Sequence, residues 1–241
     1  MTSRAELLAR RAILRTRVRG GDARAALALA RTLDRDPPRD HAAARRACEL
    51  AAEAGVADAM TLLGEMLRDG RGGRRDLSRA VRWFAEAAKR GRPDAMASLA
   101  AALQHGEGAP RDRPAAVRLF RRAAVAGAVS AMHDLALCLR QGAGVERDDA
   151  AALRWLRRAA TRGHAGAAYL VGQAYWWGRM GAPRDRARAA PFLLAAVRKG
   201  EARAAELAER ARREVLEAAP RKTGARARTE PRGRSAAAPR R

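Results

Sequence analysis

The 241-residue sequence is poor in aromatic residues, which make up 4% of it, although 48% of its residues are hydrophobic. Most of the hydrophobic residues are alanine, so each buried side chain removes little area from water. The two cysteines, Cys48 and Cys138, are too few for a disulfide framework or a four-cysteine zinc site. This composition argues against a small disulfide-rich domain, and its alanine content favours helices, because alanine is the strongest helix former.

Long hydrophobic runs are also absent. No stretch approaches eighteen consecutive apolar residues, and the first eleven residues carry charge where a secretory signal peptide would be apolar. The sequence therefore predicts a cytoplasmic protein with no membrane span, unless the true start lies upstream and includes a leader.

Acidic residues are scarce relative to basic ones. Fifty Lys and Arg against 26 Asp and Glu give a formal net charge of +24, and nearly all of the basic residues are arginine. Such charge is typical of proteins that bind nucleic acid or anionic membranes. An alanine- and arginine-rich composition is also what a GC-rich genome produces, so composition leaves both interpretations open. Residues 1–20 and 220–241 together carry half of the excess.

A 36-residue unit repeats along the chain. We number the copies as repeat 1 (21–56, degenerate), repeat 2 (57–92), repeat 3 (93–128), repeat 4 (129–164) and repeat 5 (165–201), the last with one extra residue, most simply Met180. Residues 1–20 are expected to form a basic helical segment that packs on repeat 1, with a membrane-surface helix as the alternative. Residues 202–219 are expected to form a capping helix, and the Arg-rich tail 220–241 to be disordered. A period of this length predicts a solenoid.

Each repeat has the same internal pattern. Ala59, Leu63 and Leu67 show the apolar stripe of a first helix, which ends at a pair of loop glycines. An aspartate then stands where it would cap a second helix, and the five aspartates are Asp40, Asp76, Asp112, Asp148 and Asp185. The large apolar residues expected to fill the seams between repeats are Trp83, Leu119, Trp155 and Phe192. Such a hairpin cannot bury its apolar face alone and must stack on its neighbours.

The pattern A-x-x-x-L-G-x-x-Y/L-x-x-G-x-G-x-x-x-D-x-x-x-A-x-x-W-x-x-x-A-A-x-x-G resembles the Sel-1-like repeat family over residues 21–219. The resemblance implies an all-α, right-handed α/α superhelical solenoid of about five repeats that acts as an adaptor or scaffold for other proteins. Repeat 1 departs from the pattern, with Asp34 and Asp36 in place of the loop glycines. In repeat 5, Pro191 is expected to bend or delay the second helix.

No catalytic pattern is recognisable. The four histidines, His41, His105, His133 and His164, occupy different positions within the repeat and share no ligand spacing. No nucleophile and base stand in a known motif. The sequence therefore predicts a protein that is not an enzyme and that has no catalytic residues, bound metal or cofactor.

The first helices of stacked hairpins line the inner surface, so the second, fifth, ninth and twelfth residues of each repeat should collect in a concave groove. Aromatic and adaptable polar groups there favour partner binding, and the predicted contacts are Arg68, Gln104, His133, Arg140, Tyr169, Gln173 and Trp176. Equally open is that Trp176 and Trp177 pack the irregular loop around Met180 or the bend expected at Pro191. We expect a monomer that binds a partner protein or peptide in this groove. The alternative is a nucleic-acid-associated protein whose Arg-rich tails bind weakly and without specificity.

Overall fold

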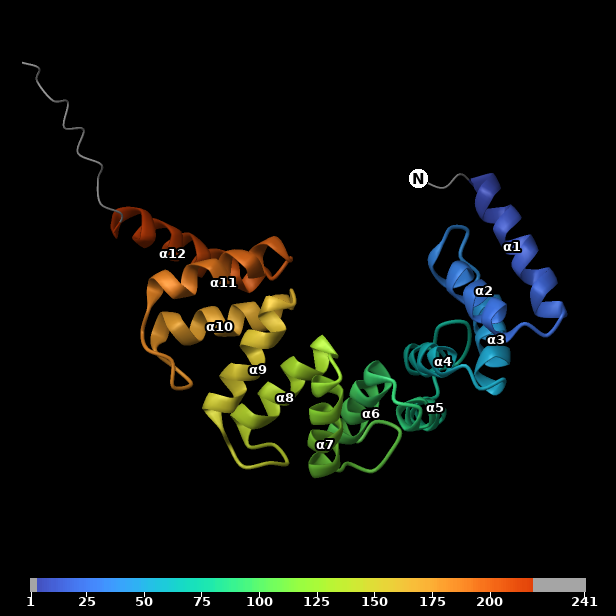
Figure 1. Cartoon of the computed structure of the whole chain (residues 1–241), viewed down its shortest axis with the longest axis horizontal. Helices are drawn as coiled ribbons and strands as arrows, with labels where there is room; N and C mark the ends of the chain where they lie inside the picture. The colour runs from blue at the N-terminus through green and yellow to red at the C-terminus, as the bar shows by residue number, and fades with distance from the viewer. Residues whose placement is uncertain (1–3, 219–241) are drawn as a thin grey trace, which may run out of the picture.

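The computed structural model describes residues 4–218, which form twelve α-helices and one short 3-10 helix and contain no strand. Figure 1 shows the helices stacked into an open arc, with α1 at one end and α12 at the other. The helices are α1 (Arg4–Arg19), α2 (Ala23–Arg35), α3 (His41–Glu53), α4 (Ala57–Asp69), α5 (Leu77–Lys89), α6 (Pro93–His105), α7 (Arg113–Val125), α8 (Val129–Gln141), α9 (Asp149–Thr161), α10 (Ala165–Trp177), α11 (Arg186–Arg198), η1 (Ala202–Ala204) and α12 (Ala205–Ala218). The predicted all-α solenoid is confirmed. The tail 220–241, predicted to be disordered, lies outside the described residues.

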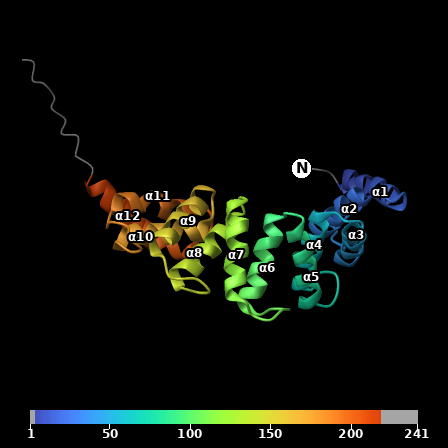
Figure 2. The same ribbon diagram turned by 60° about the horizontal axis from the view of Figure 1, so that its bottom comes forward.

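Consecutive hairpins pack in a single row (Figure 2). Each repeat pairs a first helix, even-numbered from α2 to α10, with the odd-numbered second helix that follows it, and that second helix packs on the next first helix. In the middle of the arc α4 and α6 lie toward its hollow, whereas α5 and α7 lie on its outside (Figure 1). We call the exposed faces of α4, α6, α8 and α10 the inner face and those of α5, α7, α9 and α11 the outer face.

The aspartate caps predicted for the second helices are confirmed. Each of the five loop aspartates accepts a hydrogen bond from the amide three residues later, at 2.7–2.9 Å, and so caps its second helix. The glycines that follow the second helices, of which Gly91 is one, all have positive φ. The α11 helix runs through Pro191 without a break, so this proline does not delay it as expected.

The prediction for the seam residues was wrong by one position. Phe84, Phe120, Leu156 and Leu193 are the large residues that the second helices bury fully, whereas Trp83, Leu119, Trp155 and Phe192 are only partly buried. On α5 the buried stripe passes through Ala80 and Ala87, and position 84 lies between them while position 83 lies at the flank. Gly64 of the facing helix leaves room for the Phe84 ring, because a Cβ there would come 2.5 Å from it.

The second loop glycine of repeats 2, 3 and 4 permits contact with the repeat before it, whereas the equivalent Gly181 of repeat 5 has no atom within 4 Å of an added Cβ. Gly108, with a φ of +75°, lies against the start of α5, and a Cβ at this position would clash with the carbonyl of Leu77. Gly72 and Gly144 lie in the same way against His41 and Arg113. The loop of one repeat therefore rests on the first turn of the second helix in the repeat before it.

Repeat 1 closes its loop by other means. Its first helix begins at Ala23 behind the cap Asp22, two residues later than the repeat alignment places it, so that Ala30 is the small residue buried against the second helix. In place of glycines, Arg11 of α1 covers the carboxyl end of α2. Its guanidinium, which is buried, donates to the carbonyls of Thr32 at 2.8 Å, Asp36 at 2.6 Å and Pro38 at 3.0 Å. The Thr32 carbonyl also accepts from the amide of Asp36 at 3.1 Å, whereas Asp36 and Pro38 lie beyond the last residue of α2.

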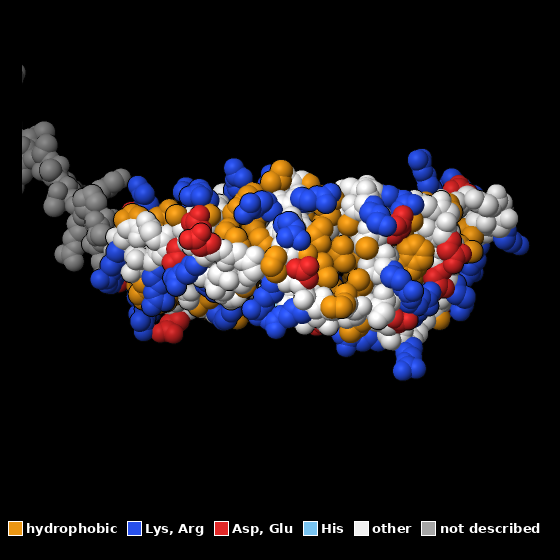
Figure 3. Space-filling model, turned by 90° about the horizontal axis from the view of Figure 1, so that it is seen from below, with side chains coloured by type: hydrophobic (Ala, Val, Ile, Leu, Met, Phe, Trp, Pro, Cys, Tyr) orange, Lys and Arg blue, Asp and Glu red, His pale blue; other side chains and the backbone are white. Residues whose placement is uncertain are grey.

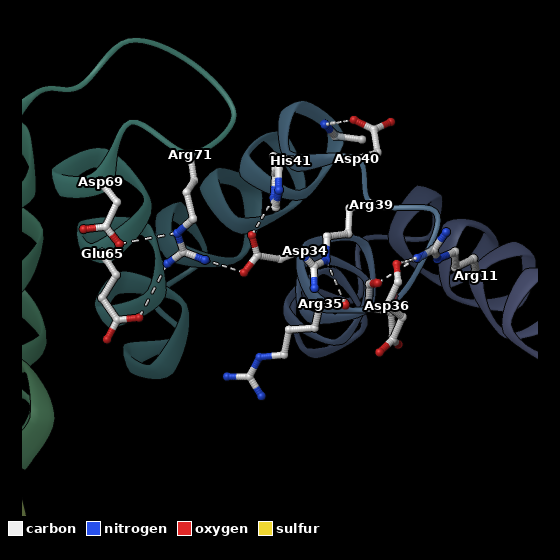
Figure 4. Close-up of polar contacts among 12 residues, drawn as sticks. Arg11, Asp34, Arg35, Asp36, Arg39, Asp40, His41, Glu65, Asp69 and Arg71 are labelled. Atoms are coloured by element: carbon white, nitrogen blue, oxygen red, sulfur yellow. Dashed lines mark hydrogen bonds and ion pairs between the residues drawn. The ribbon is translucent and has the colours of Figure 1, made fainter. Parts of the chain in front are cut away.

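A second charged contact ties repeat 1 to repeat 2, as Figure 4 shows. The buried Asp34 carboxylate accepts from Arg71, in the loop of repeat 2, and lies 2.9 Å from Nδ1 of His41. Arg71 also lies 3.9 Å from Glu65 and 3.5 Å from Asp69. One guanidinium thus joins carboxylates of both repeats.

Helices flank the array at both ends. On α1, Leu14 is buried against repeat 1 while Leu8 and Ile13 are exposed. At the other end α12 packs on α11 and buries Leu207 and Ala211. None of the helices in residues 4–218 is long and apolar enough to cross a membrane.

Candidate partner-binding surface

The inner face is accessible where the sequence predicted it. Of the predicted groove positions on α4, α6, α8 and α10, only Ala97 and Trp176 are buried, and the others are half-buried or exposed. The seventh residues of repeats 2, 4 and 5, which are Leu63, Leu135 and Val171, are fully buried beneath them, whereas Leu99 of repeat 3 is partly buried. The helical period therefore separates a packing stripe from an adjoining polar stripe on each first helix.

Arg140 and Gln173 are brought together at one pocket. It has a volume of about 310 Å³ and lies at the carboxyl ends of α8 and α10. Leu170, Ala174 and Met180 supply apolar lining, and the charged lining is Arg140, Arg147, Asp149 and Arg179. Arg147 and Asp149 form a two-bond ion pair at 3.1 and 2.7 Å, whereas Arg140 has no carboxylate partner in the described part of the chain. The pocket therefore offers donors and positive charge beside an apolar floor.

Sequence reasoning missed the loop residues of this pocket, because only first-helix positions were assigned to the groove. The signal was the extra residue of repeat 5. Met180 has a φ of 56°, the one positive φ of a non-glycine residue in residues 4–218, and it lines the pocket. The insertion thus brings an apolar side chain to the end of the groove.

His133 is paired with His164. The two rings stack at 4.4 Å between centroids, and Nδ1 of His133 lies 3.0 Å from Asp134. Nδ1 of His164 accepts from the amide of Ala167 at 3.1 Å and so caps α10. Burial, followed by the neighbouring His133, lowers the pKa of His164 below its ordinary value. The hydrogen bond from the Ala167 amide and the stacking on His133 both favour the neutral imidazole of His164.

Tyr169 lies under an arginine rather than open to solvent. The guanidinium of Arg203 lies 5.3 Å from the centre of its ring and also forms a two-bond ion pair with Glu201 at 2.7 and 2.9 Å. Together with the histidine pair this forms a polar cluster on α8, α10 and η1. The described residues nevertheless contain no group of three or more His, Cys, Asp or Glu placed to hold a metal ion.

Trp176 is 6% exposed, and the guanidinium of Arg186 lies 4.8 Å from its ring. Its indole packs α10 against α11, and it offers little surface to a partner. Trp177 is 42% exposed with Arg179 above its ring at 5.1 Å. Trp176 is therefore a packing residue rather than an exposed contact, while Trp177 remains at the surface.

Arg68 and Gln104 do not line the pocket. Nε of Arg68 donates to Asp69 at 2.9 Å, and the side-chain oxygen of Gln104 accepts from Cys138 at 3.7 Å. These two residues lie on the inner face of α4 and α6, away from the residues that line the pocket.

The two cysteines are buried free thiols. Burial raises the pKa of Cys48 to about 12 and also raises that of Cys138. Neither thiol is therefore disposed to act as a nucleophile at neutral pH.

Comparison with known families and structures agrees with this geometry. The Sel1 repeat family matches residues 57–91, 93–127, 129–164 and 165–201, which are repeats 2 to 5. No curated protein matches the chain significantly.

Solved structures show the same fold. A Sel1 repeat protein from Oxalobacter formigenes is 25% identical with a TM-score of 0.71, over 78% of this chain and 75% of that protein. A protective antigen of uropathogenic Escherichia coli is 24% identical with a TM-score of 0.68, and the match covers 87% of this chain and 53% of the antigen. A sel1 repeat protein from Klebsiella pneumoniae is 23% identical with a TM-score of 0.56, over 84% and 99% of the two chains.

Proposed function

Because the chain belongs to the Sel1 repeat family, whose solenoids typically serve as scaffolds for protein interactions, we propose that it holds a partner protein or an extended peptide against its inner face. The partner lies across α8 and α10, where the inner face offers a pocket. This interface carries no chemistry of its own, in keeping with a family that is generally non-enzymatic.

The Arg140–Gln173 pocket is the observation that carries this proposal. Its volume of about 310 Å³ fits one or two side chains of a partner. Leu170 and Met180 can bury an apolar group, while Gln173 and Arg140 can donate to backbone carbonyls or to a carboxylate. Since the Arg140 guanidinium has no carboxylate partner among the described residues, it is available to a ligand.

Other residues extend or support this site. We propose that His133 and Tyr169 extend it along α8 and α10, that Arg68 and Gln104 contact the partner farther along the groove, and that Trp176 supports the surface from below. Residues 1–20 and 202–219 act as caps, and the capped array works as a cytoplasmic monomer. The buried Leu14 and Leu207 support the capping roles.

Site-specific photo-crosslinking tests the proposal in the source cell. A benzophenone amino acid replaces Gln173 on the inner face or Val125, an exposed residue of α7, as the matched control. We expect a crosslinked partner from position 173 and not from position 125, and a weaker crosslink when Arg140→Ala is added. Equal yields at both positions, or none at 173, would contradict the inner-face assignment.

The same experiment separates the alternative function. Deleting residues 220–241 should leave the crosslink at position 173 unchanged if the inner face binds the partner. If the deletion abolishes both the crosslink and the binding of nucleic acid, the result would instead support an association through the Arg-rich tail.

A further inference from the structure

The two faces of the solenoid carry opposite charge. The second helices α5, α7, α9 and α11 contain thirteen Lys and Arg and two Asp and Glu, a net charge of +11. The first helices α4, α6, α8 and α10 have the same total length, with two basic and five acidic residues, a net charge of −3. Figure 3 views the arc from below and therefore shows its convex side, where Lys and Arg side chains outnumber Asp and Glu.

Genome composition does not account for this separation. A codon bias toward arginine would raise the ratio of basic to acidic residues on both sets of helices. Instead the ratio reverses between two sets of equal length that alternate along the chain. The basic charge therefore follows the architecture, which indicates a role for the outer face.

Most outer-face arginines lack a carboxylate partner. The second-helix arginines that form no ion pair in the described part of the chain include Arg82, Arg118, Arg121, Arg122, Arg154 and Arg157. All six are exposed. Uncompensated like charges repel one another, and an anionic ligand would relieve that repulsion.

Two tryptophans interrupt the charge at equivalent positions of repeats 2 and 4. Trp83 lies in an open pocket of about 350 Å³ with Arg79, Arg82 and Glu86, whose carboxylate is paired with Lys89 and Arg90. Trp155 lies in one of about 410 Å³ with Arg154 and Arg157. The guanidinium of Arg158 lies 4.9 Å from the centre of the Trp155 ring. Aromatic rings and guanidinium planes between cations are the features on which unstacked bases rest.

We propose that the outer face binds single-stranded nucleic acid, with phosphates on the arginines of α5, α7 and α9 and bases at Trp83 and Trp155. This is a second surface, distinct from the inner face and from the tail. A flexible strand can follow the convex side of the arc (Figure 1), whereas a flat bilayer meets only its middle. A stiff duplex keeps its bases stacked inside, away from the tryptophan pockets.

Fluorescence anisotropy with a labelled oligouridylate of about 20 nucleotides tests the proposal on the full chain. The triple variant Arg118→Gln, Arg121→Gln and Arg122→Gln changes exposed residues of α7 only. We expect its affinity at about 50 mM salt to fall at least about tenfold, and the slope of log K against log salt to decrease by about two. The matched control removes the same charge from the tail, through Arg226→Gln, Arg228→Gln and Arg232→Gln. Its affinity should change less than about threefold.

A second variant tests the stacking step. Trp83→Leu with Trp155→Leu keeps apolar packing but removes both indoles, so it should weaken binding about tenfold without changing the salt slope. An unchanged circular dichroism spectrum confirms folding. Equal losses for the α7 and tail variants, unchanged binding of the leucine variant, or binding to phosphatidylglycerol vesicles but not to the oligouridylate would each overturn the proposal.

Discussion

Repeat 1 and the interior repeats both pack against their neighbours, but they do so with different kinds of side chain. Where repeats 2 and 3 bury Phe84 and Phe120, repeat 1 buries Cys48. Where the interior loops use glycines to touch the preceding helix, repeat 1 uses the buried Arg11 and the ion pair of Asp34 with Arg71. A terminal repeat has a neighbour on one side only. The difference indicates that charged contacts can replace apolar packing where the stack ends.

The largest effect should come from the apolar seam. Phe84→Ala should reduce the free energy of unfolding by about 3–5 kcal/mol, because it removes a fully buried ring and leaves a cavity. Cys48→Ala, at the equivalent place in repeat 1, should cost only about 1 kcal/mol because fewer atoms are lost. Urea unfolding followed by circular dichroism measures both. Equal losses would show that the two repeats do not differ in how they are held together.

The interior loops give the next effect. Gly108→Ala should cost about 3 kcal/mol, because the new Cβ adds a clash with the Leu77 carbonyl to an unfavourable positive φ. Gly91→Ala is the matched control, since its φ is +80° and no atom lies within 4 Å of the added Cβ. It should cost about 1–2 kcal/mol. If the control costs as much, contact between repeats is not what this glycine provides.

In repeat 1, Arg11→Met should cost about 2 kcal/mol, since the carbonyls of Thr32, Asp36 and Pro38 lose their buried donor. The exposed Arg10→Met is the control. Hydrogen exchange should accelerate in α1 and α2 for the first variant only. Unchanged exchange there would mean that Arg11 does not hold α1 to the array.

The smallest effect concerns pH at the junction of repeats 4 and 5. The pKa of His164 is lowered by burial and by His133, although Asp134 and Glu201 act in the opposite direction. As the pH falls below about 6.5 the unfolded chain takes up this proton before the folded chain does, so stability decreases with decreasing pH. The melting temperature should fall by a few degrees between pH 7.5 and 5.5.

His164→Asn isolates that contribution. Asparagine can still cap α10 but does not titrate in this range, so the part of the pH dependence that comes from His164 should disappear. A variant with the same pH dependence as the wild-type chain would assign the effect to other groups.

Much of this fold could be predicted because its signals are local. The aspartate caps and the glycines act within a few residues of their position in the sequence, so their spacing was sufficient. The seam residue was missed because Trp83 and Phe84 are adjacent and both large, and only the phase of the buried stripe separates them.

The end contacts and the pocket depend on distant partners. Arg11 lies on the stripe formed by Leu7 and Leu14, and an arginine among apolar positions was the available signal. The contact of Arg71 with Asp34, and the meeting of Arg147 with Gln173 at one pocket, depend on how neighbouring repeats stack. A single sequence does not specify that arrangement. The burial of Trp176 depends in the same way on Arg186 of the following helix.

Hydrogen exchange of the full chain, alone and with the partner recovered by crosslinking at position 173, examines the inner-face assignment most directly. Binding should slow exchange in α8 and α10 and leave α5 and α7 unchanged. Slower exchange confined to the second helices, with α8 and α10 unaffected, would contradict it.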